Sequence, residues 1–270
     1  MGRNTRIDWC DDSWNPVTGC LHGCEYCYAR RIVHRFSDCK HESGDIHIAN
    51  YVTKDWKLHF NGEKLETENH KPRIIPYPFG FEPTLHRYKL DIPQHWKKPR
   101  TIFVCSMADL FGAWVPDSWI VEVLDACRKA PQHRYLFLTK NPDRYDALED
   151  AGIITPDDKN FWLGSTTTDI LKSRLHWDSE LHTFQSCEPM LAPWPPAGKP
   201  NEKFIGLWPD WVIFGAETGN RKGKVVPEKS WIDNAVEMCR NIGAKVFMKE
   251  SLRGIMGVDF IQEFPWEVKT

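Results

Sequence analysis

Long hydrophobic runs are missing from this sequence. The 270 residues contain no stretch of about 18 consecutive apolar residues, so a membrane-spanning helix is excluded. Residues 1–9 are polar and lack the apolar segment of a secretory signal. We therefore expect a cytoplasmic protein that does not bind a membrane.

An excess of one charge is missing as well. The chain has 35 Lys and Arg residues against 37 Asp and Glu residues, which gives a net charge of −2. This balance excludes a strongly basic coat for nucleic acid but leaves room for a local basic groove. Internal repeats and low-complexity tracts are also absent.

Two residue types are unusually frequent. Thirteen Trp suit a planar, ringed substrate, and they suit a Trp-rich core equally well. Nine Cys form an odd number in a chain without a secretory signal. That count favours a reducing compartment, with metal or redox chemistry rather than disulfides.

Short apolar, β-branched or aromatic runs alternate with amphipathic segments in the C-terminal two-thirds. This pattern predicts buried parallel strands joined by helices. The expected strands are 101–105, 134–139, 161–165, 182–186, 211–215 and 245–248, with one more near 13–17. Helices are expected after Pro116, after Asn141 and around residues 232–239. The sequence therefore predicts one α/β domain, residues 1–270.

Two segments interrupt this alternation. Residues 40–80 are polar and His-rich, then rich in Pro and Gly, and we interpret them as an irregular, lid-like insertion after the first helix. Residues 192–209 form a Pro-rich loop in place of a regular helix.

The most informative segment is the cysteine loop, residues 19–29, in which Cys20, Cys24 and Cys27 have the spacing C-x3-C-x2-C. Gly19 and Gly23 let its backbone wrap closely around an object, and a helix is expected to follow over 28–36. Three thiolates on one loop can hold three corners of a cubane iron–sulfur cluster and leave its fourth iron open, as in a catalytic site. Two alternatives remain: a structural zinc site with a histidine of the loop, His22, as fourth ligand, and three cysteines that share the loop by coincidence.

The loop, with Tyr26 as an aromatic residue before the last cysteine, is similar to the signature of the radical S-adenosylmethionine (SAM) superfamily. Further segments resemble a phage and prophage family of radical SAM proteins, formerly of unknown function. These segments are 7–9, 13–20, 80–81 with 83–86, 96–100, 106–111, 138–140, 162–164, 186–189 and 215–219. The chain departs from the family at Cys10, where Thr is expected, and at Cys105, where Asn is expected.

The resemblance implies a partial (β/α)6 TIM-like barrel with an insertion after the first helix. It implies a 4Fe-4S cluster and SAM as cofactors, with an electron donor such as flavodoxin or ferredoxin. SAM would chelate the open iron, and one electron from the cluster would break a carbon–sulfur bond. The resulting 5′-deoxyadenosyl radical would abstract hydrogen from the substrate.

Residues at the carboxyl ends of the strands are the expected site residues, because sites of parallel barrels lie there. For cofactor binding the resemblance points to Tyr26, Ser106, Met107, Asp109, Ser165, Thr166 and Glu217. Asp109 would bind the SAM ammonium group, whereas a helix cap is the alternative role for Asp109, Ser165 and Glu217.

For catalysis the same position suggests Lys140, Lys249, Cys187 and Glu188. The two lysines would attract phosphate or carboxylate groups, Cys187 would donate a hydrogen atom, and Glu188 would move a proton. The alternative for Cys187 is a small buried apolar residue.

These features favour a phage-encoded enzyme of the isomerase or lyase type in a bacterial cell. Its substrate would be a modified pyrimidine nucleotide within DNA, and its reaction a base hypermodification that rearranges an amino-acid adduct on thymine. A DNA photolesion repair lyase is the second hypothesis. A non-catalytic iron–sulfur or zinc protein is the third.

Overall fold

The structure is a computed structural model that describes residues 5, 7–37, 43–52, 58–60, 63–64, 77–170, 180–194 and 209–267. The chain divides into two compact units. The first comprises residues 1–4 and 10–135, and the second comprises residues 5–9 and 136–270.

The six strands expected in the C-terminal two-thirds, together with the one expected near residues 13–17, form one seven-stranded parallel sheet, in the order β1-β7-β8-β9-β10-β11-β12. Its strands are β1 (Asp12–Trp14), β7 (Thr101–Val104), β8 (Arg134–Thr139), β9 (Phe161–Thr166), β10 (His182–Cys187), β11 (Trp211–Phe214) and β12 (Lys245–Met248). The ends of the six later strands agree with the expected ranges within one residue, whereas β1 ends three residues before the expected 13–17 segment does. Nearly continuous apolar character suits strands that are buried on both faces.

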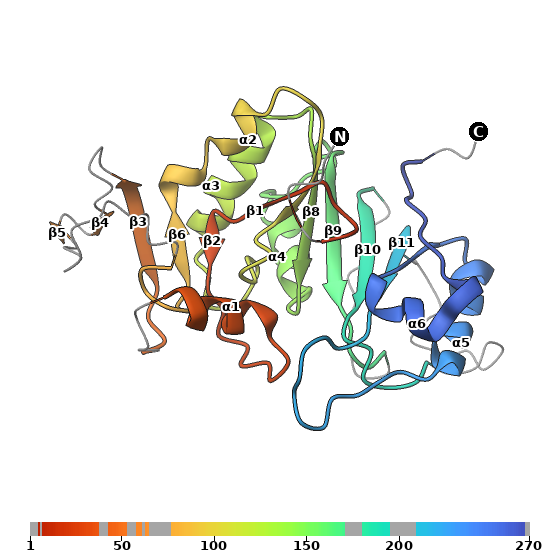
Figure 1. The fold of residues 1–270 in the computed structure, drawn as a ribbon. Coiled ribbons are helices and arrows are strands. Elements are labelled where there is room, and N and C mark those ends of the chain that lie inside the picture. Colours follow the sequence, from red (N-terminus) through yellow and green to blue (C-terminus); the bar gives the residue numbers. More distant parts are fainter. Residues whose placement is uncertain are drawn as a thin grey trace. The chain divides into compact units, whose positions relative to one another are not determined.

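A second, five-stranded sheet lies in the first unit, with the order β2-β6-β3-β4-β5 and both parallel and antiparallel pairs (Figure 1). Its strands are β2 (Val17–Thr18), β3 (His47–Val52), β4 (Leu58–Phe60), β5 (Glu63–Lys64) and β6 (Thr84–His86). The described part of segment 40–80 thus contributes three strands and is not irregular. Its remaining residues lie outside the described part of the chain.

The expected helices are confirmed. The α-helices are α1 (Tyr28–Phe36), α2 (Ile92–His95), α3 (Asp117–Arg128), α4 (Asp143–Asp150), α5 (Lys229–Asn241) and α6 (Arg253–Met256). Short 3-10 turns are η1 (Arg87–Lys89), η3 (Glu250–Leu252) and η4 (Gly257–Asp259). Among the described residues, none of these helices has the length and apolar character needed to span a bilayer.

The expected (β/α)6 barrel is wrong, although the α/β class is correct. The parallel sheet has seven strands, and its order ends at β1 and β12. A (β/α)6 barrel would have a single β/α unit between β1 and β7. In this structure the chain between those strands forms the second sheet, in which β2 pairs with β6. Within the described residues, helices directly join only β7 to β8, β8 to β9 and β11 to β12. The expected Pro-rich loop falls mostly on residues 195–208, which lie outside the described residues.

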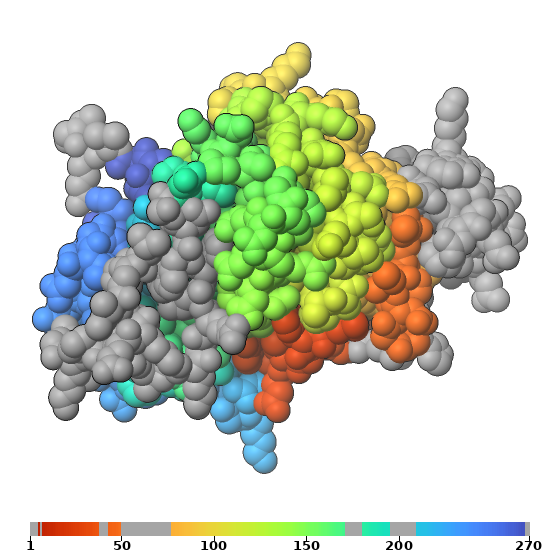
Figure 2. Space-filling model, turned by 180° about the vertical axis from the view of Figure 1, so that it is seen from behind, coloured from red at the N-terminus to blue at the C-terminus, as the bar shows by residue number. Residues whose placement is uncertain are grey.

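Helix α3 shows how the sequence pattern places the core of the first unit. Its predicted stripe Ile120, Val123, Leu124 and Cys127 is buried. Its other side forms part of the surface seen in yellow-green in Figure 2. A 3.6-residue period puts these four residues on one face of the helix, which explains why one side of α3 is buried and the other is exposed.

Six of the ten tryptophans in the described ranges lie in the core. Trp9, Trp14, Trp119, Trp162, Trp194 and Trp211 are all buried. In the second unit Trp211 is the centre of an aromatic cluster, with ring centroids 5.1 Å from Trp266, 5.8 Å from Phe247 and 6.2 Å from Trp9. Of the two interpretations of the Trp content, the core therefore accounts for these six residues.

Candidate functional site

The cysteine loop is fixed to its surroundings by its first two residues. The Gly19 N–H donates to the Met107 carbonyl at 2.9 Å, and the Cys20 N–H donates to the Phe81 carbonyl at 3.1 Å. Gly19 also forms an isolated parallel bridge with Ala108. The loop therefore starts between the residues that follow β7 and the residues that precede β6.

Both glycines expected to shape the loop have positive φ, but only one of them is enclosed. Gly19 has φ +85°, and a Cβ atom on it would lie 2.1 Å from the Glu82 carbonyl oxygen. Gly23 has φ +67° and open space around the corresponding position. Only glycine fits at position 19, because any side chain there would collide with backbone.

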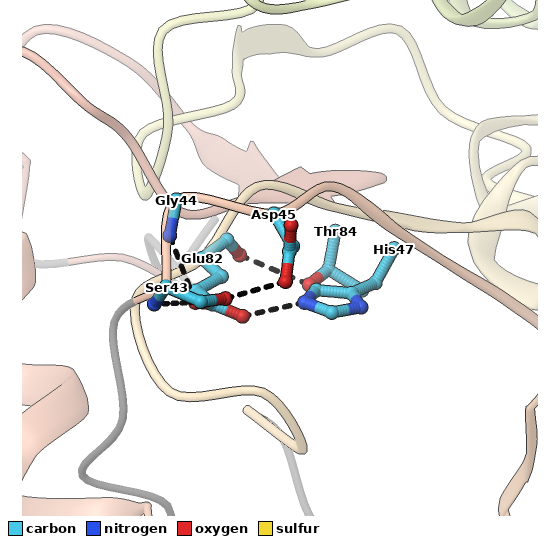
Figure 3. A network of polar contacts seen from close by, with 6 residues as sticks. All are labelled: Ser43, Gly44, Asp45, His47, Glu82 and Thr84. Carbon is cyan, nitrogen blue, oxygen red and sulfur yellow. Dashed lines mark hydrogen bonds and ion pairs between the residues drawn. The ribbon is translucent and has the colours of Figure 1, made fainter.

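The Glu82 side chain holds the start of the described insertion (Figure 3). Its Oε1 accepts hydrogen bonds from the N–H and Oγ of Ser43 and from the Gly44 N–H, while its Oε2 lies 2.5 Å from Nε2 of His47. The His47 ring stacks on Phe79 at 4.1 Å. Burial alone would raise the pKa of Glu82, but the hydrogen bonds from His47 and Ser43 outweigh it and lower that pKa. One short segment therefore anchors both the cysteine loop and the insertion.

The three loop cysteines are partly buried thiols. The pKa of Cys20 is raised to about 12, mainly by burial; the nearby Asp109, Cys24 and Cys27 contribute to the rise, and a hydrogen bond from the His22 backbone opposes it. The Cys27 sulfur caps α1 by accepting a hydrogen bond from the Arg30 N–H at 3.3 Å. The sequence thus places three partly buried sulfurs on one short loop.

A single metal ion fits this loop poorly. Within the described ranges, no three His, Cys, Asp or Glu side chains converge closely enough to surround one ion. Tetrahedral zinc with bonds of about 2.3 Å to sulfur would require such convergence. An iron–sulfur cluster offers a separate iron to each thiolate, so its ligands need not meet at one point.

The surroundings of the loop fit a buried group of this kind. Cys20 and Cys27 pack against an apolar cluster that includes Phe81 and Met107. Such walls exclude water from thiolates. Nearby, the indole Nε1 of Trp114 is buried, and no described residue accepts its hydrogen. Buried donors without a partner are rare, and a ligand bound at the loop would supply the missing acceptor.

Asp109 connects the end of β7 to the cysteine loop. Its Oδ2 lies 2.7 Å from Nε2 of His22, and its Oδ1 accepts the Phe111 N–H at 3.1 Å. The carboxylate is only 7% exposed. Asp109 therefore acts as a cap for the turn after β7 and also holds the loop through His22.

Ser106 and Met107 are organised by a residue to which sequence reasoning gave no role. The Asn15 side-chain oxygen accepts hydrogen bonds from the Ser106 Oγ at 3.1 Å and from the Met107 N–H at 3.0 Å. The Tyr28 hydroxyl donates to the Ser106 carbonyl. The structure thus brings Ser106, Met107 and Asp109 together beside the cysteine loop. Tyr26 lies partly buried in the loop itself, where its carbonyl accepts a hydrogen bond from Arg31 at 3.4 Å.

In the second unit the expected cofactor residues are more dispersed. Ser165 is buried in β9 opposite Gln185, and its neighbour Thr166 lies opposite Ser186. Adjacent strand residues point to opposite faces, so these two side chains do not share one side of the sheet. The buried Glu217 is held by Arg221 through two hydrogen bonds of 2.7 and 2.8 Å. These bonds lower the pKa of Glu217, although its burial opposes them.

Cys187 lies in the hydrophobic core. It packs in one apolar cluster with Phe214, Ile232 and Cys239. Burial raises its pKa well above the ordinary thiol value. This environment favours the packing role that the sequence left open.

Glu188 and Lys249 form a pair at the carboxyl ends of β10 and β12. Lys249 Nζ donates to Glu188 Oε1 at 2.6 Å, with the side chains 21% and 27% exposed, respectively. Their stems lie over Gly215, where a Cβ atom would be 3.0 Å from Glu188 and 3.1 Å from Lys249. Lys140, which follows β8, is partly buried. Lys249 is thus already neutralised by a carboxylate, which weakens its expected attraction for anions.

Comparison with known proteins gives a family without an assigned activity. A family model described as "Protein of unknown function (DUF5131)" matches residues 4–254. The chain belongs to this family. No curated protein and no solved structure matches it. The match covers both units, so the cysteine loop and the strand ends of the second unit all lie within the family's extent.

Sequence reasoning missed three residues around the loop. Asn15 lies in segment 13–20, which resembles the family, but the sequence predicts no role for it. His22 is expected only as a zinc ligand, and no pattern in the sequence predicts a role for Trp114. The contacts of Asn15 and His22 bridge more than 85 positions of the chain, and no local pattern signals them. The Ser106-x-x-Asp109 pattern after a strand was the available signal, and it located their partners.

Proposed function

We propose that the protein is a radical SAM enzyme in which Cys20, Cys24 and Cys27 bind one 4Fe-4S cluster. The observation that carries the proposal is the cysteine loop. Three partly buried thiols lie between backbone anchors at Gly19 and the start of α1. Three cysteine ligands leave one iron open for SAM.

The cluster with bound SAM would supply one-electron cleavage of a carbon–sulfur bond and hydrogen abstraction from the substrate. The chain's own part is to position and protect these groups. Asn15 fixes the backbone of residues 106 and 107 through its side-chain oxygen. Phe81 and Met107 keep water from the sulfurs. Asp109 offers a buried carboxylate beside the loop, suited to an ammonium group.

An electron donor such as flavodoxin or ferredoxin belongs to this proposal. Helix α1 starts directly after Cys27 and exposes Arg31, His34 and Arg35. No acidic residue occurs in this helix. We expect an acidic donor to approach along this face, because opposite charges steer association.

The substrate we propose is a modified pyrimidine nucleotide within DNA. The support is the family resemblance, which favours an isomerase or lyase acting on a phage DNA base. Glu188 and Lys249 would act on the substrate as a proton-transfer pair, because they lie within hydrogen-bond distance at strand ends. Cys187 takes no part in the proposal, because its thiol is enclosed in the core.

The test is anaerobic reconstitution with iron and sulfide, followed by incubation with SAM, dithionite and candidate phage DNA. Release of 5′-deoxyadenosine and a change in nucleoside mass are expected, with faster release when the DNA is present. Stoichiometric zinc without iron would contradict the cluster. Cleavage of SAM that is indifferent to every DNA would contradict only the substrate.

A further inference from the structure

Trp114 carries a hydrogen-bond donor with no acceptor in the described part of the chain. Its indole Nε1 is buried from solvent, and no described atom accepts its hydrogen. Roughly nine-tenths or more of buried polar groups have a partner, so this donor requires an explanation.

The orientation of the Trp114 ring is set by two neighbours. Gly112 lies under the indole, where a Cβ atom would be 2.4 Å from Cζ2 and 2.6 Å from Cε2, the ring carbon bonded to Nε1. The His22 ring meets the indole edge-to-face, with centroids 4.8 Å apart at 79°. The donor is therefore fixed in direction by packing rather than free to turn toward another acceptor.

The same turn is connected to the cysteine loop. The Gly112 N–H donates to the Asp109 carbonyl at 3.2 Å, and the Val115 N–H donates to the Gly112 carbonyl at 2.9 Å. Asp109 in turn binds His22, which lies between Cys20 and Cys24 in the sequence. The indole N–H is thus a preorganised donor at the edge of the cysteine loop.

We propose that Trp114 is a binding residue that donates its indole N–H to an anionic acceptor of the group held at the cysteine loop. The inference rests on the proposed function and extends it to a residue outside the radical SAM signature. The acceptor is either a sulfur of the cluster or the carboxylate of SAM, because both accept hydrogen bonds and carry negative charge. A hydrogen bond to a cluster sulfur would stabilise the cluster-loaded protein even without SAM, whereas a hydrogen bond to the SAM carboxylate would stabilise only the protein with SAM bound.

The experiment compares Trp114→Phe with the wild type before and after anaerobic reconstitution. Before reconstitution, Trp114→Phe should melt at the wild-type temperature or above it, because no protein hydrogen bond is lost. Trp14→Phe is the matched control. Its Nε1 donates to the Lys89 carbonyl at 2.8 Å, so that variant should melt lower. A melting temperature of Trp114→Phe lowered as far as that of Trp14→Phe would overturn the inference, since the indole would then have an internal acceptor.

After reconstitution, Trp114→Phe should lack a charge-assisted hydrogen bond to the bound group. The loss corresponds to an affinity about tenfold lower, or lower still, for whichever group accepts the bond, the cluster or SAM. If the acceptor is a cluster sulfur, iron should dissociate faster under a chelator without SAM. If the acceptor is the SAM carboxylate, iron retention should be unchanged and SAM affinity should fall. Wild-type iron retention together with wild-type SAM affinity overturns the inference and leaves the proposed function standing. A wild-type protein that assembles no cluster overturns both.

Discussion

Gly19 and Glu82 are in direct backbone contact, so close that a methyl group on Gly19 would overlap the Glu82 carbonyl. The carbonyl of Phe81, the preceding residue, accepts the Cys20 N–H. The first thiol of the cysteine loop is therefore placed by main-chain atoms of a segment some 60 residues away in the sequence. The Glu82 side chain at the same time holds Ser43 and His47.

Substitution of Gly19 should therefore be far more harmful than substitution of Gly23. Both have positive φ, a conformation that costs a non-glycine residue about 1–3 kcal/mol. Gly19→Ala adds a backbone collision, whereas Gly23→Ala meets open space. Chemical denaturation should show a loss of about 1 kcal/mol for Gly23→Ala and several times that for Gly19→Ala. Equal losses would mean that the segment 81–82 moves away at little cost.

The two roles of Asp109 can be separated by two substitutions. Asp109→Ala removes the acceptor of the Phe111 N–H and the partner of His22, so the free energy of unfolding should fall by about 1–2 kcal/mol. Asp109→Asn keeps an acceptor oxygen and loses the charge. In titrations of the reconstituted protein, both variants should bind SAM more weakly and retain iron. Unchanged SAM affinity in Asp109→Asn would leave Asp109 with its capping role alone.

The Glu217–Arg221 pair predicts an acid-sensitive contribution to stability. The pKa of Glu217 is lower in the folded protein than its usual 4.5, because Arg221 hydrogen bonds favour the ionised carboxylate. The stabilisation is therefore present above about pH 4.5 and is lost as the pH falls through the folded-state pKa. Between pH 6 and pH 3.5, the melting temperature should decrease less with falling pH for Glu217→Gln than for the wild type. A SAM affinity that depends on Glu217 but not on Arg221 would instead assign the carboxylate to the cofactor.

The Glu188–Lys249 pair should be coupled through the space above Gly215. A double-mutant cycle with Glu188→Gln and Lys249→Gln should give a coupling energy of about 0.5–1 kcal/mol, since both side chains are partly exposed. Gly215→Ala should reduce this coupling, because its Cβ would press on both stems at 3.0–3.1 Å. An unchanged coupling in the Gly215→Ala background would show that the stems can shift without losing the pair.

The order of strands along the chain was predictable, but the architecture was not. Runs such as those of β7 and β11 are short and nearly continuous in apolar character, as burial on both faces requires. The segment holding β3, β4 and β5 is polar and His-rich, so its strands left no alternating signal. Strand count and pairing depend on long-range contacts such as β2 with β6, which a single sequence does not encode locally.

In the candidate site as well, some features could be predicted from the sequence and others could not. The glycines and cysteines of the loop were predictable because spacing within a few residues decides whether thiols can gather. Position 105, where the resemblance leads one to expect Asn, has φ +58° in this chain, a conformation that Asn adopts more readily than Cys. Trp114 and Asn15 could not be predicted, because their roles arise only when distant segments meet. For Cys187 the sequence suggests a chemical role, but the structure places its thiol in the core. A position at the end of a strand does not reveal whether a thiol faces the core.

The central claim is that Cys20, Cys24 and Cys27 hold a 4Fe-4S cluster, and counting iron and sulfide after anaerobic reconstitution tests it most directly. The wild type should bind about four irons and four sulfides per chain, and the triple Cys→Ala variant almost none. Cys239→Ala, which alters a buried thiol of α5, should bind as the wild type does. Iron binding that survives the triple substitution, or a wild type that binds one zinc and no iron, would contradict the account.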